Sequence, residues 1–147
     1  MKMTKRNTGK NFEARIARWL KESGYYYQRF FDSRSVGRIV SARPADFWVF
    51  NKPNLFYIEC KSTISSRIPF SNLTQLTAHS KAILSHIKCY FFIHYIELGA
   101  GEIYAIESSK LHVFIFNAVK KRSISSKDAY SIGILINKKS DLKQLFG

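Results

Sequence analysis

The chain has 147 residues, enough for one domain, and 46% apolar residues with 15% aromatics supply a single core. Lys and Arg total 24 against 10 Asp and Glu, which gives a net charge of +14. The apolar content argues against a disordered chain, and no apolar run has the length of a membrane span. A globular protein this basic usually binds a polyanion, with nucleic acid as the first candidate and an anionic membrane surface as the second.

The beginning of the chain is basic and contains no apolar segment. We expect residues 1–8 to form a flexible basic tail and residues 9–147 to form one domain without internal repeats. A basic N-terminus of this kind is not typical of a secreted protein, and Cys60 and Cys89 lie in apolar runs typical of buried reduced thiols. These features favour a cytoplasmic protein with neither a disulfide framework nor a zinc site.

The predicted elements alternate between helices and strands. Phe12, Ile16, Trp19 and Leu20 recur at helical spacing and predict a first helix that ends at residues 23–24. The elements expected after it are a strand at 25–31, a loop at 32–43, strands at 47–50 and 55–61 joined by a turn at 51–54, a helix at 73–87, a hairpin with strands at 90–97 and 102–107, a basic loop at 120–128, a strand at 130–136 and a short helix at 141–146. This order favours an α/β domain with a mixed central sheet flanked by helices.

Two helical segments carry more specific expectations. The segment at 108–119 fits a helix capped by Ser108, although its Val, Phe and Ile content also fits a strand. His79 and His86 lie seven residues apart on the helix at 73–87, but no third ligand accompanies them, so packed or surface histidines are favoured over a metal site. One stripe of this helix contains Leu76, Ser80, Ile83, Leu84 and Ile87.

The hairpin around residues 51–54 places charged residues together. With these four residues in the turn, Asp46 lies directly opposite Glu59, and like charges in that position are destabilising. Lys61 lies on the same face of its strand as Glu59, whereas Cys60 points the other way. The hairpin therefore predicts two carboxylates and an ammonium on one face.

A hard divalent cation explains this cluster. Two carboxylates, the main-chain carbonyl of Cys60 and water molecules suit Mg²⁺, which would neutralise the repulsion and polarise a phosphate. Lys61 could then orient an attacking water or help to deprotonate it. The alternative is that Glu59 and Lys61 form a solvated ion pair at a strand edge while Asp46 merely begins a strand. The predicted register, the flanking aromatic residues and the net charge together favour the metal site.

Two further polar residues lie on the shoulders of predicted helices. Glu13 on the first helix could complete the metal shell, or it could be a solvated glutamate that pairs with a nearby arginine. Gln75 on the second helix could bind a phosphate or a metal-bound water, or it could be an exposed glutamine.

Basic residues near the start of the chain and in the loop at 32–43 are candidates for DNA contacts. Arginines on a loop just before the metal-binding strand could bind phosphates in a bidentate manner, and the alternative is a solvated loop. The candidates are Lys5, Arg6, Lys10, Arg34, Arg38 and Arg43.

The ordered set Glu13, Asp46, Glu59, Lys61 and Gln75 resembles the motif of the PD-(D/E)xK nuclease superfamily. Within it, the chain is similar to the RecU-type Holliday-junction resolvases of Gram-positive bacteria and their phages. The stretches that carry this likeness are 9–13 (GKNFE), 45–47 (ADF), 56–61 (FYIECK), 68–73 (IPFSNL) and 104–107 (YAIE), with Lys110-Leu111 after the last.

The resemblance implies a restriction-endonuclease-like core and a homodimeric enzyme that nicks two opposed strands of a four-way junction. It implies Mg²⁺ as the cofactor, with Mn²⁺ able to substitute, and branched DNA rather than a membrane as the partner. By matching position, Asp46 and Glu59 would be metal ligands, Lys61 the catalytic lysine, Glu13 an accessory acid and Gln75 the glutamine of the second helix.

The chain departs from the family pattern at three positions. Pro44 lies one position early, Ala45 stands where a hydroxyl residue is common, and Gln75 falls about two residues early. Two alternatives stay open: a restriction or repair nuclease of the same superfamily that cuts duplex or branched DNA, and a non-catalytic DNA-binding module on the same fold.

Overall fold

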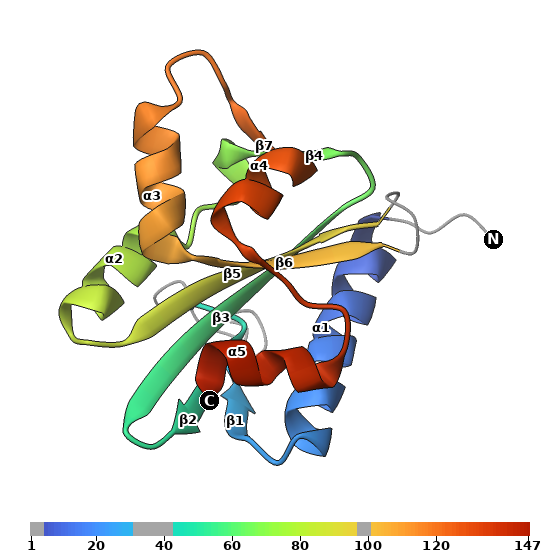
Figure 1. The fold of residues 1–147 in the computed structure, drawn as a ribbon, viewed down its shortest axis with the longest axis vertical. Coiled ribbons are helices and arrows are strands. Elements are labelled where there is room, and N and C mark those ends of the chain that lie inside the picture. The colour runs from blue at the N-terminus through green and yellow to red at the C-terminus, as the bar shows by residue number, and fades with distance from the viewer. Residues whose placement is uncertain (1–4, 31–42, 97–100) are drawn as a thin grey trace, which may run out of the picture.

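The computed structural model describes residues 5–30, 43–96 and 101–147. Its centre is a six-stranded sheet in the order β1-β2-β3-β5-β6-β8 (Figure 1). Strands β3 and β5 run parallel and the other neighbouring pairs run antiparallel, so the sheet is mixed, as predicted. The strands are β1 (Tyr26–Arg29), β2 (Phe47–Asn51), β3 (Asn54–Thr63), β5 (Lys88–Tyr95), β6 (Glu102–Glu107) and β8 (Ile134–Leu135).

Helices cover both faces of this sheet. Helix α1 (Lys5–Glu22), the 3₁₀ turn η3 (Lys139–Leu142) and α5 (Lys143–Phe146) pack on one face. The other face is covered by α2 (Leu76–Leu84), α3 (Ser108–Asn117) and α4 (Ser126–Ile132). A second sheet of two strands, β4 (Arg67–Pro69) and β7 (Ser123–Ser125), packs next to α4. The 3₁₀ turn η2 (Phe70–Asn72) follows β4 directly. None of the described helices is both long enough and apolar enough to cross a membrane.

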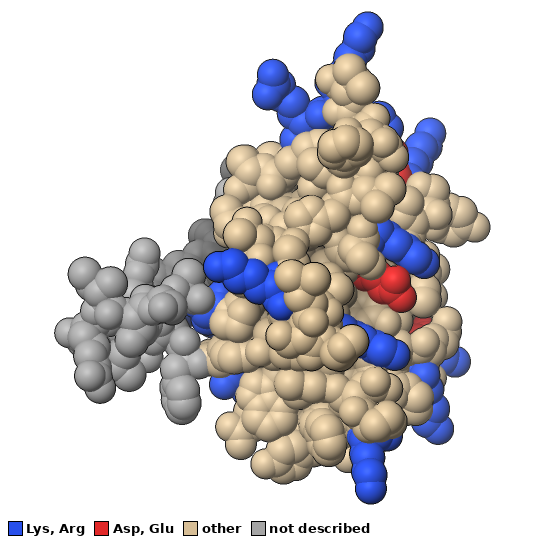
Figure 2. All heavy atoms as spheres, turned by 90° about the vertical axis from the view of Figure 1, so that its left-hand side faces the viewer, with Lys and Arg blue, Asp and Glu red and all other residues tan. Residues whose placement is uncertain are grey.

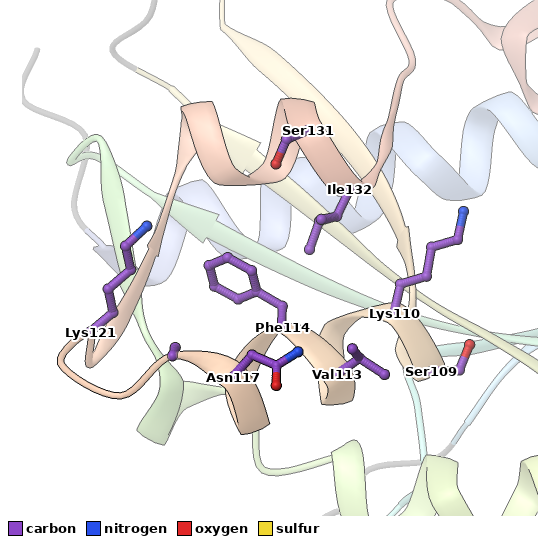
Figure 3. Close-up of a pocket in the computed structure, with 9 residues that line it drawn as sticks. Ser109, Lys110, Val113, Phe114, Asn117, Lys121, Ser131 and Ile132 are labelled. Atoms are coloured by element: carbon purple, nitrogen blue, oxygen red, sulfur yellow. The ribbon is translucent and has the colours of Figure 1, made fainter.

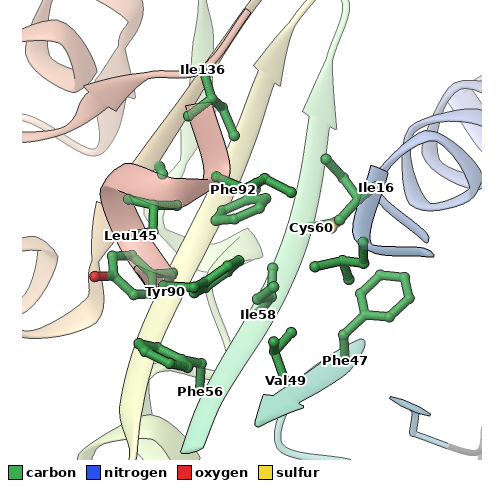
Figure 4. Close-up of a cluster of buried hydrophobic side chains, with 14 of the residues drawn as sticks. Ile16, Phe47, Val49, Phe56, Ile58, Cys60, Tyr90, Phe92, Ile136 and Leu145 are labelled. Carbon is green, nitrogen blue, oxygen red and sulfur yellow. The ribbon is translucent and has the colours of Figure 1, made fainter. Parts of the chain in front are cut away.

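Alternation along the central strand divides the core into two clusters. Successive side chains of a strand point to opposite faces, and a strand covered on both sides is apolar throughout. In β5, Tyr90 and Phe92 join the cluster under α1 and α5, whereas Phe91, Ile93 and Tyr95 join the cluster under α2, α3 and α4. Figure 4 shows the first cluster, which α1, β2, β3, β5 and the C-terminal segment build together.

Most local sequence predictions are confirmed. The β2–β3 hairpin has the predicted register, with Phe50 opposite Leu55, and β5 and β6 form the expected hairpin. The first helix ends at Glu22, as predicted, but it begins at Lys5, inside the stretch expected to be a tail. The segment from Ser108 is helical.

Several local predictions are wrong, and among them the basic loop expected at 120–128 contains β7 and the first residues of α4. Residues 126–132 form helix α4 and only Ile134 and Leu135 are in a strand, because Ser125 and Asp128 form a capping box. Ser108 is the first residue of α3 and not its cap.

The predicted stripe of α2 is also shifted. The helix buries Leu76, His79 and Ala82, at a spacing of three residues, and leaves Leu84 83% exposed. The helix ends at Leu84 because the chain turns at His86, which takes a positive φ of 65°.

Candidate active site

The candidate site lies where β2 begins alongside the middle of β3. Asp46 immediately precedes β2; its N–H donates to the Ile58 carbonyl and its carbonyl accepts from the Phe30 N–H, both at 3.0 Å. Because Phe47 pairs with Ile58, Asp46 lies opposite Glu59, as the hairpin register predicted. Each of these two acidic residues is only 2% exposed.

The side chain of Asp46 is held by a main-chain donor and faces a cation. Its Oδ2 accepts a hydrogen bond from the Cys60 N–H at 2.7 Å, and its Oδ1 lies 2.9 Å from Nη2 of Arg43. The Cys60 thiol belongs to the core cluster under α1, where burial raises its pKa. The main chain of Cys60, and not its sulfur, therefore faces the carboxylate.

Glu59 has a buried carboxyl oxygen without a partner: within the described part of the chain, its Oε2 makes no hydrogen bond. Burial raises the pKa of Glu59 far above its usual range, and the hydrogen bond to Asp46 and the charge of Asp46 raise it further. The charges of Lys61 and Arg43 act in the opposite direction. Lys61 is half-buried two residues further along β3, so the predicted ammonium lies beside the carboxylates.

Glu13 reaches this cluster from α1. It is half-buried, and its Oε2 accepts a hydrogen bond from Nη2 of Arg29 at 2.7 Å. Burial raises the pKa of Glu13, and the charge of Asp46 and a hydrogen bond to Asp46 raise it further, whereas Arg29 and Arg43 lower it. Glu13, Asp46 and Glu59 thus form one electrostatically coupled group, which we call the acidic cluster.

The acidic cluster has the donor chemistry of a hard-cation site. Opposed buried carboxylates are costly unless a proton or a cation compensates them. Across the described ranges, no three side chains of His, Cys, Asp and Glu are arranged to hold a metal ion by themselves. Mg²⁺ commonly binds through one or two carboxylates and keeps several waters, so Asp46 and Glu59 with the unpartnered Oε2 fit that ion.

The other predicted site residues lie away from the cluster or outside the described residues. Gln75 occupies the position before α2, its Oε1 accepts from Oγ1 of Thr74 at 3.3 Å, and no described contact joins it to the acidic cluster. Lys10 is exposed on α1. Arg34, Arg38 and the side chains of Lys5 and Arg6 fall outside the described residues.

Two arginines take part in the cluster in ways that the sequence did not show. Arg43, a predicted phosphate-binding residue, has its guanidinium directed at Asp46. Arg29 was not predicted as a site residue; it lies on β1 opposite Phe47 and binds Glu13. Its role depends on the pairing of β1 with β2, and local sequence carries no signal for that pairing.

A cavity of about 490 Å³ is lined by Ser62 and Thr63, which follow Lys61 on β3, and by Arg67 on β4, among others. Nη1 of Arg67 donates to Oγ of Ser123 at 3.2 Å, and none of the carboxylates in the described ranges forms an ion pair with it. Arg67 is therefore a cation at this cavity that the sequence did not single out.

Other surfaces differ from this site in character. Figure 2 shows one face of the molecule, over which Lys and Arg atoms are spread and clearly outnumber Asp and Glu atoms.

Between α3 and α4 lies a cavity of about 690 Å³ with an apolar lining that includes Val113, Phe114 and Ile132, and with Lys110 and Lys121 at its edges (Figure 3). None of the predicted site residues lines this cavity.

Comparison with known proteins identifies the fold. No protein-family model and no curated protein matches the chain. Among solved structures, the chain is similar to Hjc, a Holliday junction resolvase of Archaeoglobus fulgidus, with a TM-score of 0.56 and 18% sequence identity. The similarity covers 86% of this chain and 94% of the Hjc chain. The predicted fold class is therefore confirmed: the chain has the nuclease-like α/β fold of Hjc, with a mixed central sheet flanked by helices.

Proposed function

We propose that this chain is a structure-selective DNA endonuclease of the RecU type, which resolves four-way junctions by paired, Mg²⁺-dependent hydrolysis of phosphodiester bonds. The observation that carries the proposal is the pair Asp46 and Glu59, each only 2% exposed and directly opposed, with Lys61 beside them. Similarity to the fold of Hjc supports a nuclease, and the net charge of +14 supports a polyanionic substrate.

Asp46 and Glu59 would hold the metal ion, together with water and the main-chain carbonyl of Cys60. Bound Mg²⁺ supplies Lewis-acid stabilisation of the phosphoryl oxygens and lowers the pKa of a bound water; Mn²⁺ can supply the same chemistry. The Cys60 N–H fixes Oδ2 of Asp46. Oε2 of Glu59 has no hydrogen-bond partner among the described residues and is available as a ligand. The pairing of Glu13 with Arg29 holds this third acid near Asp46, where it would serve as an accessory group.

Lys61 is the residue of this chain placed to act on the attacking water. Its ammonium is close enough to Glu59 to lower the pKa of that carboxyl group. From this position it would orient the water or help to remove its proton, and it would stabilise charge that develops on the phosphate.

Positive charge around the cluster supports binding of DNA. Arg67 lies at the cavity beyond Lys61 and is suited to bind a backbone phosphate, in addition to the predicted contacts from Lys5, Arg6, Lys10, Arg34, Arg38 and Arg43. Paired incision of a four-way junction requires two active sites related by a two-fold axis, so the proposal includes a homodimer. The proposal includes the cytoplasm as the compartment, as the sequence features favoured.

A duplex-cutting restriction or repair nuclease would need the same residues, so the substrate has to be tested directly. The protein is incubated with Mg²⁺ and either a four-way junction or a linear duplex of the same sequence, with EDTA as the control. Symmetric nicks in the junction alone are expected. Equal cutting of both substrates would overturn junction resolution in favour of the duplex-cutting alternative. Junction binding without any cutting would indicate a non-catalytic binding module.

A further inference from the structure

His79 is a buried histidine that links three separate parts of the fold. It lies on α2, has no exposed surface, and its ring packs 5.0 Å from the ring of Phe91 and 6.5 Å from that of Tyr57. Its Nδ1 is 2.7 Å from Oγ of Ser108 at the start of α3, and its Nε2 is 2.8 Å from the carbonyl oxygen of Pro44. A buried imidazole needs hydrogen-bond partners, and here the two partners connect α2 to α3 and to the chain that enters β2.

These contacts determine how the ring is protonated. A carbonyl oxygen can only accept, so Nε2 of His79 must carry the proton and donate to Pro44. In the neutral ring Nδ1 is then an acceptor, and the Ser108 hydroxyl donates to it. Burial lowers the pKa of His79 to about 4, with the Pro44 contact acting in the opposite direction, and this agrees with a neutral ring at pH 7.

The Pro44 carbonyl lies two residues before Asp46, where the chain enters the candidate site. The main chain of Asp46 is fixed by two hydrogen bonds, one to Phe30, which follows β1, and one to Ile58 on β3. Arg43, next to Pro44, turns back to Oδ1 of Asp46. His79 therefore holds the main chain two residues before Asp46, although its helix, α2, carries none of the proposed metal ligands.

We propose that His79 is a positioning residue: by holding the Pro44 carbonyl, it sets the orientation of residues 43–46 and so of the Asp46 carboxylate. The Ser108 hydroxyl acts through His79, because it fixes the ring with Nε2 directed at Pro44. The effect of this clamp on metal affinity rests on the proposed function, whereas its effect on the main chain of Asp46 does not. Groups that orient a metal ligand typically change metal affinity about 10–100-fold when they are removed.

The test uses three variants of the full chain. His79→Phe keeps a ring in the core and removes both hydrogen bonds, and Ser108→Ala removes only the group that fixes the ring. The matched control is His112→Phe, because His112 on α3 also bonds to α2, with Nε2 2.6 Å from Oγ of Ser80, but makes no described contact with Pro44. For each folded variant, Mn²⁺ binding without DNA and amide hydrogen exchange of Asp46 are measured.

We expect His79→Phe to weaken Mn²⁺ binding at least about tenfold and to speed exchange of the Asp46 amide, Ser108→Ala to do both to a smaller extent, and His112→Phe to do neither. If His79→Phe does not fold, Ser108→Ala decides the test. Unchanged exchange and Mn²⁺ affinity in the folded variants would overturn the proposal, as would equal losses in His112→Phe. If the wild-type chain binds no Mn²⁺, the proposed metal centre fails, and unchanged Asp46 exchange in His79→Phe would also overturn the clamp.

Discussion

Two carboxylates of this chain, Asp128 and Glu59, occupy opposite environments. Asp128 lies in the first turn of α4, where its Oδ2 accepts from the Ser125 N–H at 3.0 Å and its Oδ1 lies 3.0 Å from Nζ of Lys121. Burial opposes its charge, but these donors outweigh burial, and the pKa of Asp128 is lowered. Glu59 is buried with one oxygen unpartnered in the described structure, and burial and Asp46 raise its pKa.

The difference separates carboxylates that stabilise the fold from one that costs stability. The surroundings of Asp128 favour its charge, which is what a helix cap needs. The surroundings of Glu59 oppose its charge, and perturbed groups of this kind gather at functional sites. A bound cation would compensate the buried charge of Glu59 and so explain why a carboxylate that destabilises the metal-free fold is present there.

The largest effect is expected when Asp46 changes. Asp46→Asn retains an acceptor for the Cys60 N–H but removes the charge that would hold the metal, so junction cleavage should fall on the order of a thousandfold. Junction binding without metal should be unchanged or tighter, because a negative charge is removed. Cleavage of labelled junctions and gel-shift titrations measure the two properties.

The matched control for this variant is Asp128→Asn, which changes a carboxylate of the other class. It should cut junctions at the wild-type rate even though the fold is less stable. Normal cutting by Asp46→Asn, or equal inactivity of Asp128→Asn, would contradict the distinction between carboxylates of the candidate site and carboxylates that stabilise the fold.

The next effect concerns Glu59 and the dependence of stability on pH without divalent cations. A raised folded-state pKa means that folded Glu59 keeps a proton that the unfolded chain, with a pKa of about 4.3, has already lost. This contribution is fully present below the unfolded pKa and is lost as pH rises. Between pH 7 and pH 8 the free energy of unfolding should fall by at most about 1.4 kcal/mol per pH unit.

Denaturant unfolding in EDTA measures this slope. The window from pH 7 to 8 is chosen because His79 and His94, whose folded pKa values are lowered to about 4, contribute an opposite slope near and below the unfolded pKa of about 6.5, and this contribution fades as pH rises above 7. Relative to the wild-type chain, Glu59→Gln should lose the downward slope that Glu59 contributes, because the contributions of the histidines and of Cys60 and Cys89, whose pKa values burial raises, are common to both chains. An equal slope in the variant would show that Glu59 is not the group that titrates.

A smaller effect is expected at the cap of α4. Ser125→Ala removes the oxygen that accepts from the Asp128 N–H at 3.1 Å and should cost about 1 kcal/mol, which lowers the Tm by about 2–4 °C for a chain of this size. Junction cleavage below the Tm should be unaffected. Thermal unfolding and cleavage assays on the same preparation check both statements, and a parallel loss of cleavage would contradict the separation of the two regions.

Local sequence was sufficient where the structure depends on local chemistry. The turn at 51–54 and the alternation on either side of it determine the β2–β3 register, and that register alone places Asp46 opposite Glu59. Helix α4 was readable in principle from Ser125 and Asp128, but Tyr, Ile and Leu in the following residues favoured a strand.

The remaining features depend on contacts between distant parts of the chain. Arg29 reaches Glu13 because β1 pairs with β2, and His79 reaches Pro44 because α2 packs over the sheet. Neither contact has a spacing that a sequence pattern could reveal. Arg43 differs from these two residues, because it lies only three residues before Asp46; its pairing with Asp46 is local in sequence but depends on the path of the chain into β2.

The smallest expected effect is that of Lys121, the cation that faces Asp128. Its side chain is 48% exposed, so solvent screens the ion pair, and Lys121→Met should cost only about 0.2–0.5 kcal/mol. Methionine keeps an unbranched stem near the ring of Phe114, over which the ammonium lies at 5.5 Å. The pKa of Asp128 should rise in the variant yet stay below its ordinary value, because both Ser125 contacts persist. Carboxyl-carbon NMR titration and thermal unfolding measure the two changes; a loss larger than that of Ser125→Ala would mean that the ion pair, and not the cap, makes Asp128 a stabilising carboxylate.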